Sequence, residues 1–265
     1  MCRLLAYLGS PISLETLLYK PEHSLIVQSY KPREMLSGTV NADGFGVGWY
    51  RQNSTEKDIE PFTYKNTLPI WNDTNLPSLS RYIESECVLA YVRSATAGQV
   101  LDLSNCQPFK YEHLLFIHNG LIDNFRQTLY RPIRNLLSDK IYQSINGNTD
   151  SEHIFSLLLN QLQANPGKTL EQALHGTLLL LAEMAQSYES YVLGNVVISD
   201  GNRLIASRFA SQSSAPSLYW LRDDPNFPKS VIIASEPLSD GNWISCPENS
   251  IISVGSDCDI RIEQI

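Results

Sequence analysis

Apolar residues follow two different periods along the chain, and each period predicts a different kind of element. Short apolar or alternating runs bounded by Gly, Pro, Asn or charged residues predict strands. These runs cover residues 3–8, 44–50, 87–92, 114–117, 191–199, 202–208, 218–221, 230–234 and 251–254. Apolar residues spaced by three and four predict helices at 13–18, 75–83, 124–138, 149–159 and 169–187.

Capping residues indicate where the two long helices begin. Thr149 with Glu152, and Thr169 with Gln172, have the spacing of a capping box, in which the N-cap hydroxyl and the third side chain each accept a backbone N–H. The two apolar helices therefore read as a hairpin whose stripes cover a sheet. Strands, two adjacent helices and further strands together predict one α+β domain over residues 1–265.

Glycine stands at every second position of one predicted strand, at Gly44, Gly46 and Gly48. The spacing does not match G-x-G-x-x-G, and no βαβ unit surrounds it, so it does not indicate dinucleotide binding. It leaves one strand face bare, which suits close approach by another backbone or by a ligand. We expect tight packing, since that is the commoner use.

Composition limits the class of protein and its partners. Of 265 residues, 43% are hydrophobic and 18% are charged, as in an ordinary globular chain. The 28 acidic and 20 basic residues give a net charge of −8 without any Lys/Arg cluster, which argues against a nucleic-acid partner. No apolar stretch is long enough to span a bilayer, so we expect a cytoplasmic protein that does not associate with membranes.

The cysteines and histidines do not indicate a cofactor. Five cysteines are scattered without a C-x-x-C pair, which predicts neither a disulfide framework nor a zinc site. We expect four of them to be reduced thiols: Cys87, Cys106, Cys246 and Cys258. His118 and His153 match no metal-ligand spacing and are expected to be structural. No metal or organic cofactor is implied.

Cys2 follows the initiator methionine directly. Removal of Met1 would make this cysteine the N-terminal residue, which then carries both a nucleophilic thiol and a free α-amine with a reference pKa of roughly 7.7–8.0. Such an amine can act as the base for its own thiol, so no histidine is required. The alternative is a small apolar residue at the head of a buried strand, which is the commoner state of a free cysteine.

Two apolar runs end in polar groups that suit acyl transfer. Asn119-Gly120 follows the run at 114–117, and a side-chain amide and an unhindered N–H can stabilise one oxyanion together. An Asn-Gly pair is otherwise a common turn. Arg93, which follows the run at 87–92, can bind a carboxylate through two parallel hydrogen bonds, or form a structural ion pair.

Asp150 lies in the first turn of a predicted helix. Its carboxylate could hold a substrate ammonium group. Acidic residues are also common at helix starts, because they complement the helix dipole.

These residues, in this order, resemble the class II glutamine amidotransferases. The segments that carry the resemblance are Met1-Cys2, Asn41-Ala42-Asp43-Gly44, Arg93-Ser94-Ala95-Thr96, His118-Asn119-Gly120, Thr149-Asp150-Ser151-Glu152 and Ala234-Ser235-Glu236-Pro237. The resemblance implies an N-terminal-nucleophile hydrolase fold, a four-layer αββα sandwich with antiparallel sheets. It also implies roles for six residues: Cys2 as nucleophile, Asn119 and Gly120 as oxyanion hole, and Arg93, Thr96 and Asp150 as the clamp on a γ-glutamyl group.

The chain departs from the biosynthetic members of the family. Those commonly carry a tryptophan after the arginine and a histidine after the threonine, where this sequence has Ser94 and Ala97. We expect no acceptor domain after this fold. The chain instead resembles the stand-alone branch, and its opening block, with residues 28–30 and 32–33, is most similar to the enzymes that hydrolyse γ-glutamyl-hercynylcysteine sulfoxide in ergothioneine biosynthesis.

The predicted activity is therefore hydrolysis of a γ-glutamyl amide through a thioester on Cys2, with a small-molecule substrate. Three alternatives remain open. The chain could be a glutaminase subunit that delivers ammonia to a partner synthase, a glutathione-type γ-glutamyl peptide hydrolase, or a catalytically inactive γ-glutamyl sensor. Residues 235–237 could line the pocket, but the sequence assigns them no chemical role.

Overall fold

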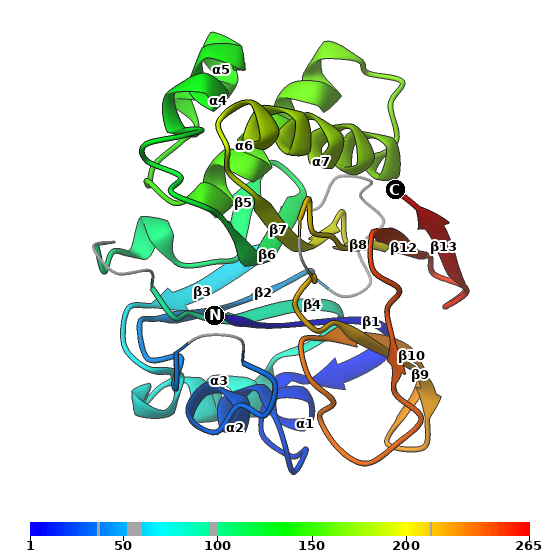
Figure 1. Cartoon of the computed structure of the whole chain (residues 1–265). Helices are drawn as coiled ribbons and strands as arrows, with labels where there is room; N and C mark the ends of the chain where they lie inside the picture. The colour runs from blue at the N-terminus through cyan, green and yellow to red at the C-terminus, as the bar shows by residue number, and fades with distance from the viewer. Residues whose placement is uncertain (36–37, 52–59, 96–99, 213) are drawn as a thin grey trace.

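Two antiparallel sheets stack face to face between two layers of helices (Figure 1). The structure is a computed structural model that describes residues 1–35, 38–51, 60–95, 100–212 and 214–265. Within these ranges one sheet has seven strands in the order β11-β9-β10-β1-β4-β2-β3, and the other has six in the order β13-β12-β8-β7-β6-β5. This is the αββα sandwich that the family resemblance implies, and it agrees with the α+β domain predicted from the residue pattern.

The first sheet contains the N-terminal strand near its centre. Its strands are β1 (Arg3–Ser13), β2 (Phe45–Trp49), β3 (Phe62–Asn66), β4 (Glu84–Val92), β9 (Tyr219–Asp224), β10 (Phe227–Ala234) and β11 (Ile244–Ser245). The helices on its outer side are α1 (Leu14–Leu18), α2 (Leu25–Tyr30) and α3 (Leu76–Tyr82), with a 3-10 turn η1 (Ile70–Asn72). β1 pairs with both β4 and β10, so its backbone is held on both sides.

The second sheet is covered by the long helices. Its strands are β5 (Phe109–Tyr111), β6 (Leu114–Ile122), β7 (Val192–Ser199), β8 (Leu204–Arg208), β12 (Ser250–Val254) and β13 (Ile260–Gln264). The remaining helices are α4 (Tyr130–Leu136), α5 (Asp139–Gln143), α6 (Asp150–Ala164) and α7 (Leu170–Ser187), with a 3-10 turn η2 (Leu103–Asn105) before β5. Apolar residues of α6 and α7 pack on β6, β7 and β8, as the predicted helical hairpin requires.

Side-chain alternation divides the core into layers and decides which way the N-terminus faces. Leu4 and Ala6 pack between the two sheets, whereas Leu5 and Tyr7 face the helices outside the first sheet. Since successive strand residues point to opposite faces, Cys2 shares the inner face with Leu4, and it packs against the inter-sheet cluster.

The structure corrects several sequence predictions about local structure. β6 does not end before His118 but continues to Ile122, with Asn119 opposite Asn195 of β7. The apolar run stops because side chains near the site are polar, while backbone pairing continues. The helix predicted at 124–138 begins only at Tyr130, after hydrogen-bonded turns.

A further difference concerns the capping boxes predicted for the two long helices. Thr169 and Gln172 form the complete capping box. Thr149 accepts the N–H of Glu152, but the Glu152 carboxylate accepts N–H groups from Asn146 and Gly147 instead of returning to Thr149. The side chain thus anchors the loop before α6 and leaves the predicted box half formed.

The glycine-rich strand is used for tight packing, as expected. A Cβ at Gly46 would collide with the backbone carbonyl of Gln107, so the bare face of β2 admits the chain before β5. The Gln107 side chain then binds both the N–H and the carbonyl of His118. The glycine pattern therefore sets the position of the residue next to Asn119.

Candidate active site

Cys2 is half-buried at the head of β1 and is not walled off in the interior. Its sulfur accepts the backbone N–H of Ser94 at 3.3 Å and lies 3.4 Å from the Ser94 carbonyl oxygen. Arg3 pairs with Val92, so extending the antiparallel register by one step places Cys2 opposite Arg93. Cross-strand pairs share a face, and both side chains therefore belong to the inner side of the sheet.

Arg93 is buried directly after β4, and its surroundings involve the Asn41–Gly44 motif. Its N–H donates to the Gly44 carbonyl, its carbonyl accepts from Asp43, and its Nη1 lies 3.3 Å from the Asp43 carbonyl oxygen. The Asp43 carboxylate in turn accepts the N–H of Ala95 at 2.8 Å. The loop after Arg93 is therefore tied to the glycine-rich segment. Thr96, which the sequence also assigns to the substrate clamp, lies outside the described residues, as does Ala97.

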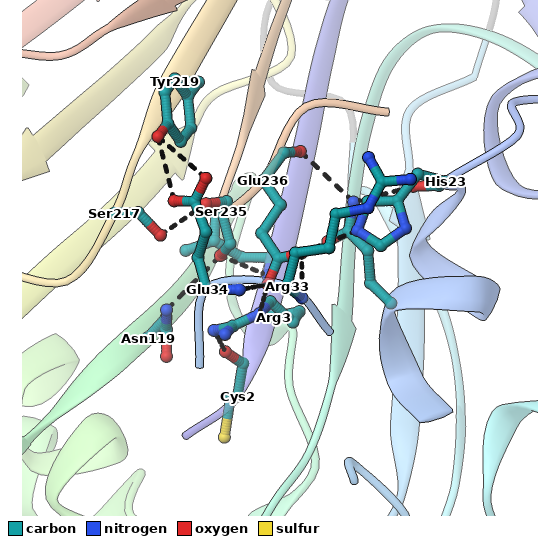
Figure 2. Close-up of polar contacts among 12 residues, drawn as sticks. Cys2, Arg3, His23, Arg33, Glu34, Asn119, Ser217, Tyr219, Ser235 and Glu236 are labelled. Carbon is teal, nitrogen blue, oxygen red and sulfur yellow. Dashed lines mark hydrogen bonds and ion pairs between the residues drawn. The ribbon is translucent and has the colours of Figure 1, made fainter. Parts of the chain in front are cut away.

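Asn119 approaches the N-terminal strand from the opposite sheet. Its Nδ2 donates to Ser235 Oγ at 3.4 Å, and the same hydroxyl accepts the N–H of Leu4 at 3.0 Å. Asn119 is fully buried, and its Oδ1 has no hydrogen-bond partner in the described part of the chain. One serine thus bridges the amide to the strand that carries Cys2 (Figure 2).

The N–H of Gly120 points to the open edge of β6. Backbone N–H groups alternate sides along a strand, so residues 118, 120 and 122 share a side. On that side His118 donates to the Gln107 side chain, and Ile122 donates to Asp150 Oδ2 at 2.9 Å. Within the described residues β5 pairs with β6 only at 114–116, so the Gly120 N–H lies between these two groups with no described strand beside it.

Asp150 is in the first turn of α6, as predicted, and is nearly buried. Oδ1 accepts the N–H of Ser151 and Oδ2 that of Ile122, each at 2.9 Å. Because Ile122 is two residues beyond Gly120, the carboxylate lies about 7 Å along the same edge, at roughly 3.4 Å per residue. The edge of β6 therefore offers an N–H donor and an anion side by side.

Both histidines are satisfied by protein partners, as predicted. Nε2 of His118 is 2.9 Å from the Leu193 carbonyl, so this nitrogen carries the proton, and Nδ1 faces Ser151 Oγ. Burial lowers the pKa of His118. Burial likewise lowers the pKa of His153 to about 4, with Arg134 donating to its Nε2. In the described ranges no three His, Cys, Asp or Glu side chains are grouped to hold a metal ion.

Tyr91 is a site residue that the sequence reasoning missed. It lies on the inner face of β4, paired with Leu4. Burial raises its pKa, the neighbouring Cys2 thiol raises it further, the charge of Arg93 lowers it and that of Asp150 raises it. The phenol is therefore within electrostatic range of three predicted site residues at once. The signal was a hydroxyl-bearing side chain in the next-to-last position of an otherwise apolar run.

Glu236 is a second residue whose role was missed, and it forms a buried polar cluster behind Cys2 (Figure 2). Oε1 accepts Arg3 Nε at 2.7 Å and the N–H of Glu34 at 3.0 Å. Oε2 accepts His23 Nε2 at 2.7 Å and the N–H of Arg33 at 2.8 Å. Burial opposes the charge, but the hydrogen bonds from His23 and the two N–H groups, with Arg3 nearby, outweigh it and hold the pKa of Glu236 at about 2.

This depressed pKa predicts a loss of stability in acid. A carboxyl whose pKa falls from 4.5 to about 2 on folding stabilises the native state above pH 4.5, and the stabilisation is lost as the pH falls from 4.5 toward 2. For Glu236 we expect a contribution on the order of 3 kcal/mol. Urea unfolding of wild type and Glu236→Gln at pH 7 and pH 3 measures this contribution. The difference in free energy of unfolding between the two proteins should be smaller at pH 3 than at pH 7. An equal gap at both pH values would contradict it.

The structure places a half-buried thiol and a buried arginine at the end of one sheet, an amide on the facing sheet and a carboxylate in the first turn of α6. The family model described as "Glutamine amidotransferases class-II" matches residues 1–227. The chain belongs to the class II glutamine amidotransferases. As a member it is an enzyme of the hydrolase and amidotransferase type that acts on amide bonds.

Two relatives match this amidotransferase over nearly its whole length. A probable glutamine amidotransferase of Saccharomyces cerevisiae is 32% identical over 293 residues, covering 96% of this chain and 82% of the relative. A γ-glutamyl-hercynylcysteine sulfoxide hydrolase of Mycolicibacterium smegmatis is 30% identical over 255 residues, covering 96% of both chains.

Solved structures support the fold. The glutamine aminotransferase class-II domain protein of Silicibacter pomeroyi superposes with a TM-score of 0.73 at 24% identity, covering 100% of this chain and 98% of that one. The glutamine phosphoribosylpyrophosphate amidotransferase of Bacillus subtilis gives 0.65 at 15% identity, with 99% of this chain but 49% of that chain covered. No helix in the described ranges has the length and apolar character needed to cross a bilayer.

Proposed function

We propose that this amidotransferase hydrolyses a γ-glutamyl amide, with Cys2 as the nucleophile once Met1 has been removed. The observation that carries the proposal is the juxtaposition at Cys2. Its sulfur accepts a backbone N–H at 3.3 Å from the loop that follows Arg93, and one serine bridges Leu4 to Asn119. A donor at sulfur favours the negative charge that develops there.

The reaction begins with transfer of the thiol proton to the α-amine of Cys2. The thiolate attacks the γ-glutamyl carbonyl, and the oxyanion is stabilised by the Asn119 amide and the Gly120 N–H. The ammonium returns its proton to the leaving nitrogen, and water then hydrolyses the thioester. Burial lowers the pKa of the amino terminus at Met1, and burial of the Cys2 amine after removal of Met1 would act in the same direction and favour the free base.

In this proposal the glutamyl group is held at its α-carbon through both of its charged groups. Arg93, on the same face as Cys2, binds the α-carboxylate, and Asp150 binds the α-ammonium. The distance of about 7 Å along β6 between the Gly120 N–H and Asp150 is compatible with the length of a glutamyl chain from its γ-carbonyl to its α-amine. Thr96 completes the clamp in the family pattern. Residues 1–265 act as one domain of this type.

For the substrate we propose γ-glutamyl-hercynylcysteine sulfoxide. The support is the mycobacterial relative with that activity in its name, which aligns over 96% of both chains. The yeast relative favours a second candidate, release of ammonia from glutamine.

Rates for three compounds distinguish these candidates: the sulfoxide, glutamine and glutathione, assayed with protein whose intact mass shows loss of Met1. Fastest turnover of the sulfoxide supports the proposal. Preference for glutamine would indicate ammonia delivery to a partner, and preference for glutathione a peptide hydrolase. Binding without turnover would indicate a sensor.

Arg93→Lys tests the carboxylate clamp. A lysine keeps the charge but cannot form two parallel hydrogen bonds, so we expect kcat/KM to fall about 10- to 100-fold, mainly through KM. Arg203→Lys is the matched control, because Arg203 is half-exposed and pairs with Asp200 and Glu171 away from the proposed site. Steady-state kinetics on the preferred substrate measure both variants, and an unchanged KM for Arg93→Lys would contradict the clamp.

A further inference from the structure

A single carboxylate connects the nucleophile's backbone to a distant loop. Arg3 lies 1% exposed, and while its Nε binds Glu236, its Nη1 donates to the carbonyl of Cys2 at 2.7 Å. The Glu236 carboxylate also accepts the N–H groups of Arg33 and Glu34, which lie 202 or more positions before Glu236 in the chain. Figure 2 shows Glu236 between Arg3 and His23, with the sulfur of Cys2 directed away from the cluster.

We propose that Glu236 is a positioning residue for Cys2, acting through Arg3 on the Cys2 carbonyl and through Arg33 and Glu34 on the loop before β2. This inference rests on the proposed function of Cys2 as nucleophile. Loss of Met1 leaves Cys2 as the terminal residue, attached to the sheet by one peptide bond. The Arg3 hydrogen bond to its carbonyl then restrains the orientation of that residue, and with it both the thiol and the amine.

Stability alone does not account for this cluster. Buried ion pairs are often replaceable by apolar residues without loss of stability, because desolvation offsets the attraction. Arg3 Nη2 is also buried without a hydrogen-bond partner among the described residues, which carries a further penalty. A strand whose other outward residues, Leu5 and Tyr7, pack as apolar core could accommodate an apolar side chain at position 3.

The Glu236 backbone is held independently of its carboxylate. Ser235 N–H donates to the Leu4 carbonyl at 3.0 Å, and Gln28 Nε2 donates to the carbonyls of His23 at 3.0 Å and Glu236 at 3.3 Å. The N–H of His23 donates to the Leu238 carbonyl at 2.8 Å. A side-chain variant at position 236 therefore has a backbone framework in which to fold.

Glu236→Gln is a direct test, because each oxygen of the Glu236 carboxylate accepts hydrogen bonds from two donors. In the variant one of these oxygens is replaced by an NH2 group, which cannot accept from the two donors that face it. On the Oε2 side His23 can change tautomer and accept, which leaves only the Arg33 N–H without an acceptor. On the Oε1 side the amide would oppose Arg3. Either arrangement weakens the restraint while conserving size.

We expect Glu236→Gln to lower kcat by about 10- to 100-fold, with KM changed less than about threefold, because a small misplacement of a nucleophile slows chemistry more than binding. Arg3→Met should give a similar loss. The double variant should be no slower than the slower single variant if Glu236 acts through Arg3.

The control is Asp73→Asn, which removes another buried carboxylate that accepts from four donors: Tyr64, Asn66, Asn75 and Leu76. It should lower stability in urea without lowering kcat. Equal loss of kcat in Asp73→Asn, or unchanged kcat in folded Glu236→Gln, would overturn the positioning role.

A readout without substrate separates this inference from the proposed function. The rate of Cys2 alkylation by iodoacetamide, followed across pH 6–9 by peptide mass spectrometry, should change in rate or midpoint in Glu236→Gln, with half-buried Cys258 as internal reference. A changed profile in a protein that hydrolyses no γ-glutamyl compound would leave the positioning intact and reject the function. An unchanged profile with normal hydrolysis would reject the positioning alone.

Discussion

Replacement of Cys2 by Ala is expected to lower kcat for γ-glutamyl hydrolysis by at least about 10³-fold, the largest effect that we predict for any single side chain. In the proposed mechanism the thiol of Cys2 forms the covalent bond to substrate, and no other described cysteine is placed to substitute for it. Cys87, Cys106 and Cys246 are buried, and burial raises the pKa of each thiol. Steady-state and single-turnover kinetics on the preferred substrate measure the loss.

Cys258→Ala is the matched control for this experiment. Cys258 is half-buried like Cys2, but its sulfur contacts the Lys229 carbonyl and its pKa is raised by burial. The control should keep wild-type kcat. Wild-type protein that retains Met1, identified by its intact mass, should be as inactive as Cys2→Ala, because its cysteine lacks a free amine. Activity in a chain that still carries Met1 would contradict the proposed base.

Asn119→Ala is expected to reduce kcat by about 10²- to 10³-fold, with little change in KM. In the proposed mechanism the amide N–H of Asn119 acts only when negative charge develops on the γ-carbonyl oxygen, so its loss should raise the barrier without weakening the ground-state complex. The Asn119 amide uses only one of its two N–H protons in the long 3.4 Å contact with Ser235 Oγ. Pre-steady-state measurement of thioester formation locates the effect in the acylation step.

The control lies directly opposite on the neighbouring strand. Asn195 pairs with Asn119 across β6 and β7 and is equally buried, and its Nδ2 donates to the carbonyls of Pro216 and Ser217 at 2.9 and 3.0 Å. Asn195→Ala should lower the free energy of unfolding by about 1–3 kcal/mol while kcat stays near wild type. Matching losses of kcat in both asparagine variants would show a general effect of burial and not an oxyanion contact.

Much of the fold followed from local patterns. The apolar runs at 87–92 and 230–234 are strands, and the caps at Thr149 and Thr169 start the two long helices. These signals are readable because side-chain period and cap hydrogen bonds involve residues a few positions apart. The same alternation places Cys2 on the inner face of β1.

The residue types of the candidate site could be proposed from the sequence, but their arrangement could not. Asn119-Gly120 was read as following a strand, whereas both residues lie within β6, at a stretch beyond the reach of β5. No local pattern reports where a neighbouring strand ends. The ion pair between Arg3 and Glu236, 233 positions apart, could not be predicted either, because a single arginine in an apolar strand gives no indication of which residue it pairs with.

The sequence by itself determined the family and the long helices and central strands, and it predicted the nucleophile, because a cysteine behind the initiator, periodic apolar positions and an ordered set of motifs are properties of neighbouring residues. Tertiary structure alone decided which groups meet. Sheet register put Cys2 opposite Arg93, the bare face at Gly46 let Gln107 reach His118, and one buried carboxylate joined Arg3 to the loop at residues 33–34. Hydrogen bonds between segments hundreds of residues apart depend on that register, which only the packed chain specifies.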